Sequence, residues 1–290
     1  MTMAWDGPTR TKIAAIQLAP LPDRERTLAR AVELAHMAAD RGAKLVAFPE
    51  LFAGPWFPGA IDKTSFDLAE PADGPTVTAM RQAAQARGVV IVCPFFEKKV
   101  EGRCYNSAAV IDADGAVLGV YRKVHVPQIP YWEERSYFAA GDAGFPVFKT
   151  AVMNVGVALG WDVLFPETAR MLALGGAHLV VAPTAGTRQS HDLWERAIGG
   201  AAFANGLVVL RVNRIGQGEG QVFHGTSFCV SPFGDVIDQA SGEGEGLLLV
   251  EVNPRDIELV RREWPLLKDR RPECYLGLAG LEVRAAEKES

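Results

Sequence analysis

Cysteine is scarce in this 290-residue sequence, and the four cysteines do not form a recognisable site. Cys93, Cys104, Cys229 and Cys274 contain no Cys-x-x-Cys pair and no spacing to histidine that is typical of zinc binding. Free thiols without a disulfide framework are typical of proteins in a reducing compartment. We therefore expect a cytoplasmic protein with free thiols and no structural zinc.

Basic clusters and long apolar runs are also missing. Lys and Arg number 30 against 35 Asp and Glu, which gives a net charge of −5 and argues against binding to nucleic acid or an anionic membrane. The longest apolar run, residues 89–96, contains Pro94 and is far shorter than the roughly 20 residues of a membrane span. The first eight residues lack the basic and apolar segments of an export signal, so we expect a cytoplasmic protein.

The composition that remains is that of a globular protein, with 48% apolar and 22% charged residues. Strand-like and helix-like segments alternate along the chain, which is typical of an α/β fold. There is no linker, low-complexity segment or break in composition. We therefore expect one domain over residues 1–290 with a tail from about residue 263. Two similar halves of hairpins and crossover helices predict two stacked sheets with helices outside.

The predicted elements follow from hydrophobic periodicity and from glycine and proline positions. Gly42 and Gly88 are expected to end the first two helices. Two hairpins are expected around the turns at 112–115 and 232–235. Strands are predicted at 13–19, 45–49, 89–95, 106–111, 116–121, 155–159, 179–182, 207–212, 223–231, 236–239 and 247–252, and helices at 24–41, 76–87, 166–174, 192–204 and 254–262.

Three titratable residues follow or adjoin the ends of predicted strands. Glu50 closes one strand, Lys123 follows another, and Glu134 lies in the loop after it. Ligands collect at the carboxyl ends of strands in α/β sheets. A Glu and a Lys brought together there can act as a general base and as a cation that stabilises an oxyanion. Position alone also allows surface charges or structural ion pairs.

Gly160 lies at a corner between a predicted strand and a predicted helix. Such corners present nucleophiles beside backbone N–H groups, but glycine has no side chain to present. Without further information, Gly160 is equally a residue that permits a tight turn.

Three sequence blocks, Phe48-Pro-Glu50-Leu-Phe, Tyr121-Arg-Lys123-Val-His-Val-Pro127 and Gly160-Trp-Asp162-Val-Leu-Phe-Pro-Glu167, resemble the signatures of the nitrilase (carbon–nitrogen hydrolase) superfamily. The resemblance covers roughly residues 12–275. The resemblance extends through Tyr105-Asn-Ser, Asn213-Arg214 and the closing Trp264-Pro…Asp-Arg-Arg-Pro272 segment. These later blocks look most like the branch of N-carbamoylputrescine amidase and β-ureidopropionase, and the closing segment favours the former. The resemblance implies a four-layer αββα sandwich, a homodimer or higher homo-oligomer, and a small-molecule substrate. It implies no metal and no organic cofactor.

The resemblance also implies roles for individual residues. Glu50 takes the place of the general base, Lys123 that of the oxyanion-stabilising residue, and Glu134 that of the second glutamate, with Glu133 as its rival. The position of the nucleophilic cysteine is occupied by Gly160. In the family route a thiolate attacks an amide or ureide and water hydrolyses the resulting acyl-enzyme. Among the other thiols, Cys104 is the least implausible substitute.

Four further residues are candidates for the wall of the substrate pocket. Trp56 and Trp132 flank the loops of the two glutamates, Trp161 follows Gly160, and His125 neighbours Lys123. Ordinary core packing is an open alternative for the tryptophans. A hydrogen-bonded structural role is an open alternative for His125.

Three hypotheses about function remain open at this stage. The first is an amidase for an N-carbamoyl amine or small amide whose nucleophile has been removed by design. The second is a natural enzyme that uses Glu50 and Lys123 for water activation or for proton transfer without covalent catalysis. The third is a catalytically inactive binding homologue.

Overall fold

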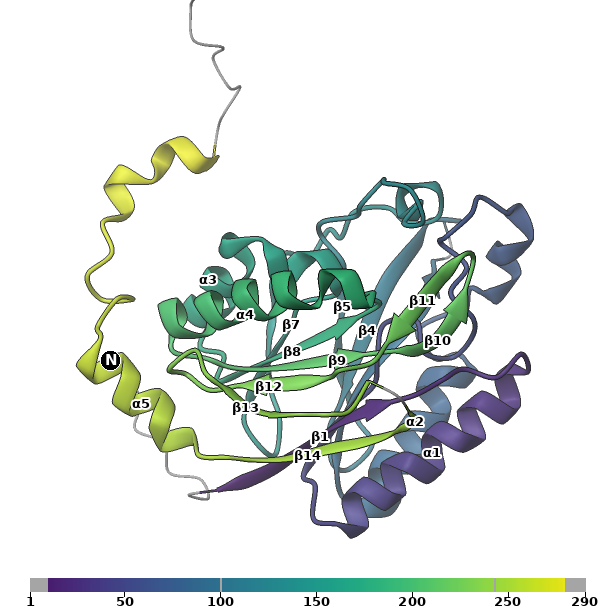
Figure 1. The fold of residues 1–290 in the computed structure, drawn as a ribbon, viewed down its shortest axis with the longest axis horizontal. Coiled ribbons are helices and arrows are strands. Elements are labelled where there is room, and N and C mark those ends of the chain that lie inside the picture. Colours follow the sequence, from purple (N-terminus) through teal and green to yellow (C-terminus); the bar gives the residue numbers. More distant parts are fainter. Residues whose placement is uncertain (1–9, 100, 243, 280–290) are drawn as a thin grey trace, which may run out of the picture.

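Two six-stranded β-sheets stacked face to face form the centre of the molecule (Figure 1). The computed structural model describes residues 10–99, 101–242 and 244–279. The first sheet has the strand order β14-β1-β2-β3-β4-β5. Its strands are β1 (Thr11–Gln17), β2 (Leu45–Ala47), β3 (Val90–Lys98), β4 (Cys104–Ile111), β5 (Val117–Arg122) and β14 (Gly246–Val252).

The second sheet repeats the plan of the first and has the order β13-β12-β9-β8-β7-β6. In each sheet three consecutive strands are parallel, β1-β2-β3 and β7-β8-β9, and the remaining pairings are antiparallel. The strands of the second sheet are β6 (Val147–Lys149), β7 (Asn154–Val157), β8 (Leu179–Thr184), β9 (Val208–Asn213), β12 (Phe228–Val230) and β13 (Val236–Gln239).

Helices cover the outer face of each sheet. The helices α1 (Arg24–Asp40) and α2 (Pro75–Arg87) pack on the first sheet, and α3 (Pro166–Leu174) and α4 (His191–Asn205) pack on the second (Figure 1). The order of layers is therefore helix, sheet, sheet, helix. This confirms the predicted four-layer αββα sandwich.

The central strands are apolar on both faces because each sheet is covered twice. On β3, Val90 and Val92 face the other sheet, whereas Ile91 and Cys93 face α1 and α2. All four side chains are fully buried. A strand that is buried on both sides has no polar face, and this explains the continuous apolar run in the sequence.

The first two helices end where glycine was expected to end them. Gly42 and Gly88 adopt left-handed φ angles of +94° and +61° just after α1 and α2. The amide of Gly88 donates to the carbonyl of Ala84, which satisfies one carbonyl of the last turn.

The predicted strand at 223–231 was wrong, because the chain turns sharply in its middle. Gly225 and Thr226 adopt left-handed φ angles of +62° and +51°. At this turn Asn213 Nδ2 donates to the carbonyl of Gly225 (2.7 Å), and a Cβ at Gly225 would lie 2.3 Å from the side chain of Gln17. The segment before the turn, β11 (Gln221–His224), pairs with β10 (Ile215–Gly218) in a separate ribbon, and only β12 joins the second sheet.

The end of the described chain continues beside α3 and α4, where Arg270 and Tyr275 line a hollow together with residues of these two helices. The helix α5 (Pro254–Glu263) is followed by two short 3-10 turns, Pro272–Cys274 and Leu276–Ala279, which Figure 1 shows in yellow beside the main body. Trp264 at the start of this tail is 55% exposed. Among the described residues, no helix combines the length and the apolar character required to cross a bilayer.

Replacing Gly88 by alanine tests the role of the left-handed helix end. We expect Gly88→Ala to lower the free energy of unfolding by about 1–2 kcal/mol, because a Cβ is unfavourable at φ +61° although no atom lies within 4 Å of it. Urea unfolding measures this. Gly54→Ala is the matched control, since Gly54 also has open space but no left-handed φ, and an equal loss in both variants would contradict the explanation.

Candidate active site

Three charged residues predicted as site residues meet in one buried cluster. Glu50 follows β2, Lys123 follows β5, and Glu134 opens a short 3-10 turn, Glu134–Ser136. Their exposed fractions are 2%, 1% and 1%. They are not surface charges, and the structure brings together residues that are up to 84 positions apart, from Glu50 to Glu134.

The ammonium group of Lys123 holds both carboxylates. Lys123 Nζ donates to Glu50 Oε1 (2.8 Å) and to the two oxygens of Glu134 (2.9 and 2.7 Å). Glu133, the rival in the sequence, lies outside the cluster and accepts a hydrogen bond from Gln128 instead. Charge-assisted hydrogen bonds of this kind are strong when they are shielded from water.

Asn106 belongs to this cluster, and the sequence reasoning gave it no role. Its Nδ2 atom lies 2.8 Å from Glu50 Oε1 and 3.4 Å from Glu134 Oε2, so that the amide donates between the two carboxylates. Asn106 is fully buried on β4, next to β5, the strand that Lys123 follows. The block Tyr105-Asn-Ser was part of the resemblance, and it was the available signal for this residue.

The cluster contains two carboxyl groups for one ammonium group, and burial together with these charges shifts the pKa values of Glu134 and Lys123. Burial, opposed by Lys123 and supported by the charge of Glu50, raises the pKa of Glu134 to about 7. Burial alone would lower the pKa of Lys123, but the neighbouring Glu134 and Glu50 raise it above its usual value. Glu134 can therefore gain or lose a proton near neutral pH while Lys123 stays charged.

Gly160 lies against the charged ends of this cluster. A Cβ built on Gly160 would lie 2.7 Å from Lys123 Nζ and 2.8 and 2.9 Å from the carboxylate oxygens of Glu50. Its φ of +47° is one that residues with a side chain rarely adopt. Any side chain at position 160 would thus begin within reach of a base and a cation, and glycine lets these two groups approach one another.

The turn at Gly160 is anchored by the next carboxylate along the chain. Asp162 is fully buried, and its oxygens accept from the hydroxyl of Tyr121 (2.6 Å) and from the backbone amide of His125 (2.8 Å). The Nδ1 atom of His125 also lies 2.8 Å from Asp162, and its ring stacks on Phe165 at 3.7 Å. Asp162 thereby joins the segment after Lys123 to the turn at Gly160.

A cavity of about 360 Å³ opens above the cluster. Trp132 and Trp161 line it, as expected, whereas Trp56 and His125 do not. Trp56 is buried elsewhere and donates to the carbonyl of Tyr131 (3.2 Å), and His125 lines a neighbouring hollow that shares Trp161. The lining residues are Glu50, Lys123, Ile129, Trp132, Glu134, Gly160, Trp161, Leu164, Ala185, Gly186, Thr187, Gln189, Ser190, Leu193 and Trp194.

Two buried residues at the end of β9, Asn213 and Arg214, fix the loops around this cavity. Asn213 accepts from the amide of Gly186 (2.8 Å) and donates to its carbonyl (2.9 Å), which clamps the cavity wall. Arg214 donates to the carbonyl of Gly54 (2.9 Å) in the loop that follows Glu50. The pair Asn-Arg was also part of the resemblance, but its structural role became visible only in the fold.

No cysteine lines the cavity within the described ranges. Cys93 and Cys229 are fully buried core residues, Cys274 is exposed in the tail, and Cys104 packs among the aromatic side chains of another cluster. Burial raises the pKa of the Cys104 thiol. Cys104 is therefore a packing residue, and it is not placed to replace a nucleophile at position 160.

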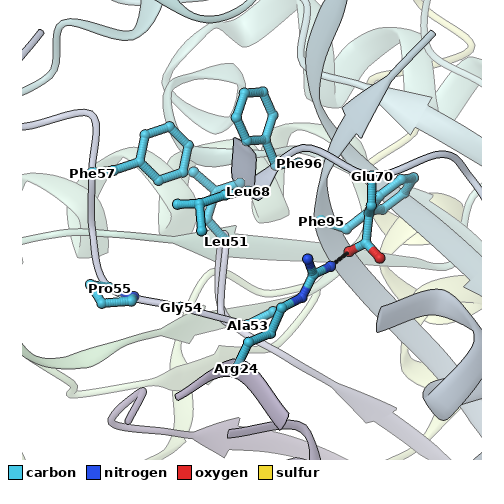
Figure 2. A pocket seen from close by; sticks show the side chains of 10 residues that line it. All are labelled: Arg24, Leu51, Ala53, Gly54, Pro55, Phe57, Leu68, Glu70, Phe95 and Phe96. Carbon is cyan, nitrogen blue, oxygen red and sulfur yellow. Dashed lines mark ion pairs between the residues drawn. The ribbon is translucent and has the colours of Figure 1, made fainter. Parts of the chain in front are cut away.

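A second, smaller hollow has a structural explanation. It has a volume of about 40 Å³, which suits a water molecule or two, and Figure 2 shows the ion pair of Arg24 and Glu70 at its edge. Glu70 Oε2 also accepts from the amide of Thr76 (2.9 Å) in the first turn of α2. This carboxylate caps a helix, and the hollow beside it is no candidate for a substrate site.

The comparison with known proteins agrees with this geometry. Residues 12–262 match the family described as carbon-nitrogen hydrolase. This chain belongs to the carbon–nitrogen hydrolase family. It is 38% identical over 286 residues to the N-carbamoylputrescine amidase of Solanum lycopersicum, which covers 93% of this chain and 95% of the relative.

Solved structures of the nitrilase superfamily have the same fold. The carbon–nitrogen hydrolase of Helicobacter pylori G27 superposes with a TM-score of 0.89 and 32% identity over 93% of this chain and 99% of the other. A cysteine-to-alanine mutant of the amidase from Nesterenkonia sp. AN1, in complex with butyramide, superposes with a TM-score of 0.76 and 29% identity over 91% and 95%. In another structure of that amidase, an acetamide moiety is covalently added at the active-site cysteine.

The raised pKa of Glu134 predicts a pH-dependent stability. The folded chain holds this proton up to pH about 7, whereas the ordinary value is 4.5, so the stabilisation is complete below pH 4.5 and is lost as the pH rises through about 7. Relative to Glu134→Gln, the free energy of unfolding of the wild type should fall over this window and stay level above it. Urea unfolding from pH 4.5 to 8.5 measures this.

The neighbouring substitution Glu133→Gln is the control for this experiment. Because Glu133 lies outside the cluster, its variant should keep the pH profile of the wild type. A constant difference between wild type and Glu134→Gln across the window would contradict the assignment of the titrating group.

Proposed function

We propose that this chain binds a small amide or N-carbamoyl amine in the cavity above Gly160, with Glu50, Lys123 and Glu134 around the C–N bond. The observation that carries this proposal is the convergence of a base, a cation and a proton-exchanging carboxyl group on one point of the cavity floor. The membership of the carbon–nitrogen hydrolase family supports the substrate class.

The groups around Gly160 match the polarity of an amide. The Lys123 ammonium suits the carbonyl oxygen, and its positive charge stabilises the oxyanion that forms when a nucleophile attacks the carbonyl carbon. Glu50 is the base that takes the proton of the nucleophile, and Glu134, with its pKa of about 7, can return a proton to the leaving nitrogen. The surrounding apolar wall of Trp132, Trp161 and Leu164 keeps these interactions strong by excluding water.

The component that this site lacks is a nucleophilic side chain. An amide is a poor electrophile, and the covalent route needs a thiolate beside its base. In this chain that place is taken by Gly160, so we propose a hydrolase scaffold without the thiol of its relatives. The cysteine-to-alanine Nesterenkonia mutant in complex with butyramide supports the idea that such a pocket still binds an amide when the thiol is absent.

Restoring a thiol at position 160 tests this proposal. We expect Gly160→Cys to release ammonia from simple amides or N-carbamoyl amines at least about 100-fold faster than the unmodified chain, because a thiolate is then formed next to Glu50. The variant should also have a lower Tm, since its Cβ displaces Lys123 and Glu50 and its φ is strained. Ammonia release across a substrate panel and thermal unfolding measure both effects.

Gly160→Ala is the matched control, because it introduces the same Cβ and the same strain without a thiol. It should stay at background activity, and so should Gly160→Cys combined with Glu50→Gln. If folded Gly160→Cys releases no ammonia from any compound that binds in the cavity, the hydrolase scaffold is the wrong interpretation.

A second function is favoured by the geometry of the cluster, in which Lys123 Nζ donates to Glu50 and Glu134 on the cavity floor and burial raises the pKa of Glu134 to about 7. Such a pair can move a proton within a bound substrate, or Glu50 can activate water, without a covalent step. In that case the unmodified chain should be active, Glu50→Gln should lower kcat by at least about 100-fold, and Gly160→Cys should gain little. Product analysis by mass spectrometry of the unmodified chain and Glu50→Gln with cavity ligands decides between the two functions.

A further inference from the structure

Another buried cation, Arg211, lies close to the wall of the cavity, and no carboxylate among the described residues is paired with it. Arg211 on β9 has no exposed surface, and its Nε, Nη1 and Nη2 atoms have no hydrogen-bond partner among the described residues. Burial lowers the pKa of this guanidinium to about 9, which leaves it charged at neutral pH. Arg214, three residues later and equally buried, does have partners, because it donates to the carbonyl of Gly54 (2.9 Å).

The guanidinium of Arg211 lies against Gly186, a residue that lines the cavity. A Cβ on Gly186 would lie only 2.4 Å from Arg211 Nη2, so the absence of a side chain at 186 is what admits the guanidinium. Its Cζ atom lies 5.2 Å from the ring of Trp194 and 5.4 Å from that of Phe228. Both Gly186 and Trp194 line the cavity on their other side.

An anion close to Arg211 would stabilise its buried charge. A buried charge without a counter-charge is unfavourable, and stacking on the two aromatic rings offsets this only in part. No carboxylate of the described residues is paired with Arg211, and the two acidic residues that line the cavity, Glu50 and Glu134, are already held by Lys123. The two lining residues that lie against Arg211, Gly186 and Trp194, carry no negative charge.

We infer that the cavity takes a ligand that carries a carboxylate at the end opposite its amide or carbamoyl group, and that Arg211 selects this charge from behind Gly186. The inference rests on the proposed function and adds the charge of the substrate to it. Attraction through the glycine backbone needs no rearrangement, since the field of a buried charge is weakly screened. A direct hydrogen bond would need residues 186–190 to move aside. Arg211 is thus a specificity-determining residue and not a catalytic one.

Matched pairs of short ligands test this inference on the unmodified chain. Succinamate and glutaramate carry an amide and a carboxylate, butyramide and valeramide are their neutral counterparts, and 4-aminobutyramide carries the opposite charge. By isothermal titration calorimetry we expect at least one of the two carboxylates to bind at least 10-fold more tightly than its neutral counterpart, and 4-aminobutyramide to bind more weakly than butyramide. Equal affinities within both pairs, or a preference for the cation, would overturn the inference.

Substitution of Arg211 assigns the preference to this side chain. Arg211→Met, which keeps the length and removes the charge, should abolish the preference while the affinity for butyramide changes less than twofold. Its thermal stability should be unchanged or higher, because an unpaired buried charge is removed. Arg211→Lys keeps the charge and should retain part of the preference, and it is the variant to use if the methionine variant fails to fold. A preference that persists in Arg211→Met would overturn the assignment.

Butyrate, which has the carboxylate but no amide, separates the failure of this inference from the failure of the proposed function. If butyrate binds through Arg211 and neither neutral amide binds, the anion site stands and the proposed amide site is wrong. If the neutral amides bind and the carboxylates have no advantage, the amide site stands and the anion site is wrong. If no compound of the set binds, both are wrong.

Discussion

The buried ammonium of Lys123 between the carboxylates of Glu50 and Glu134 is the interaction on which the site depends. This ammonium group joins the ends of β2 and β5 to the loop after β5, and all three side chains are buried. Removal of Lys123 would leave two carboxyl groups buried without a counter-charge, which is far more costly than the loss of a surface ion pair. The surplus carboxyl group is also what gives the site a proton that can exchange near neutral pH.

Gly160 shows how the absence of a side chain shapes this candidate site. Its left-handed φ and the close approach of Glu50 and Lys123 suit glycine, because a Cβ at this position would lie under 3 Å from both groups. Gly186 has a comparable effect, because its missing side chain makes room for the guanidinium of Arg211. At both positions glycine brings a charged group closer to the cavity than any other residue would permit.

Much of the fold could be predicted from the sequence, because the signals were local. The central strands are buried on both faces and therefore read as apolar runs, and α3 was predicted at its observed bounds, 166–174. The prediction of one strand at 223–231 was wrong because the cause of its break is not local. Its break depends on Gln17 and Asn213, which reach the turn from distant parts of the chain. The three-residue strand β6 was missed because it is too short to show a period.

For the site, the sequence by itself determined which chemical groups are present. The blocks around Glu50, Lys123 and Gly160 identify the family, and the glycine at 160 needs no structure to be noticed. Only the tertiary structure decided which of these groups touch. It brought Glu134, and not Glu133, to Lys123, and it placed His125 on Asp162 instead of in the cavity. It also left Arg211 without a hydrogen-bond partner among the described residues. Contacts of this kind join residues far apart in the chain, and their strength depends on burial, which no single stretch of sequence contains.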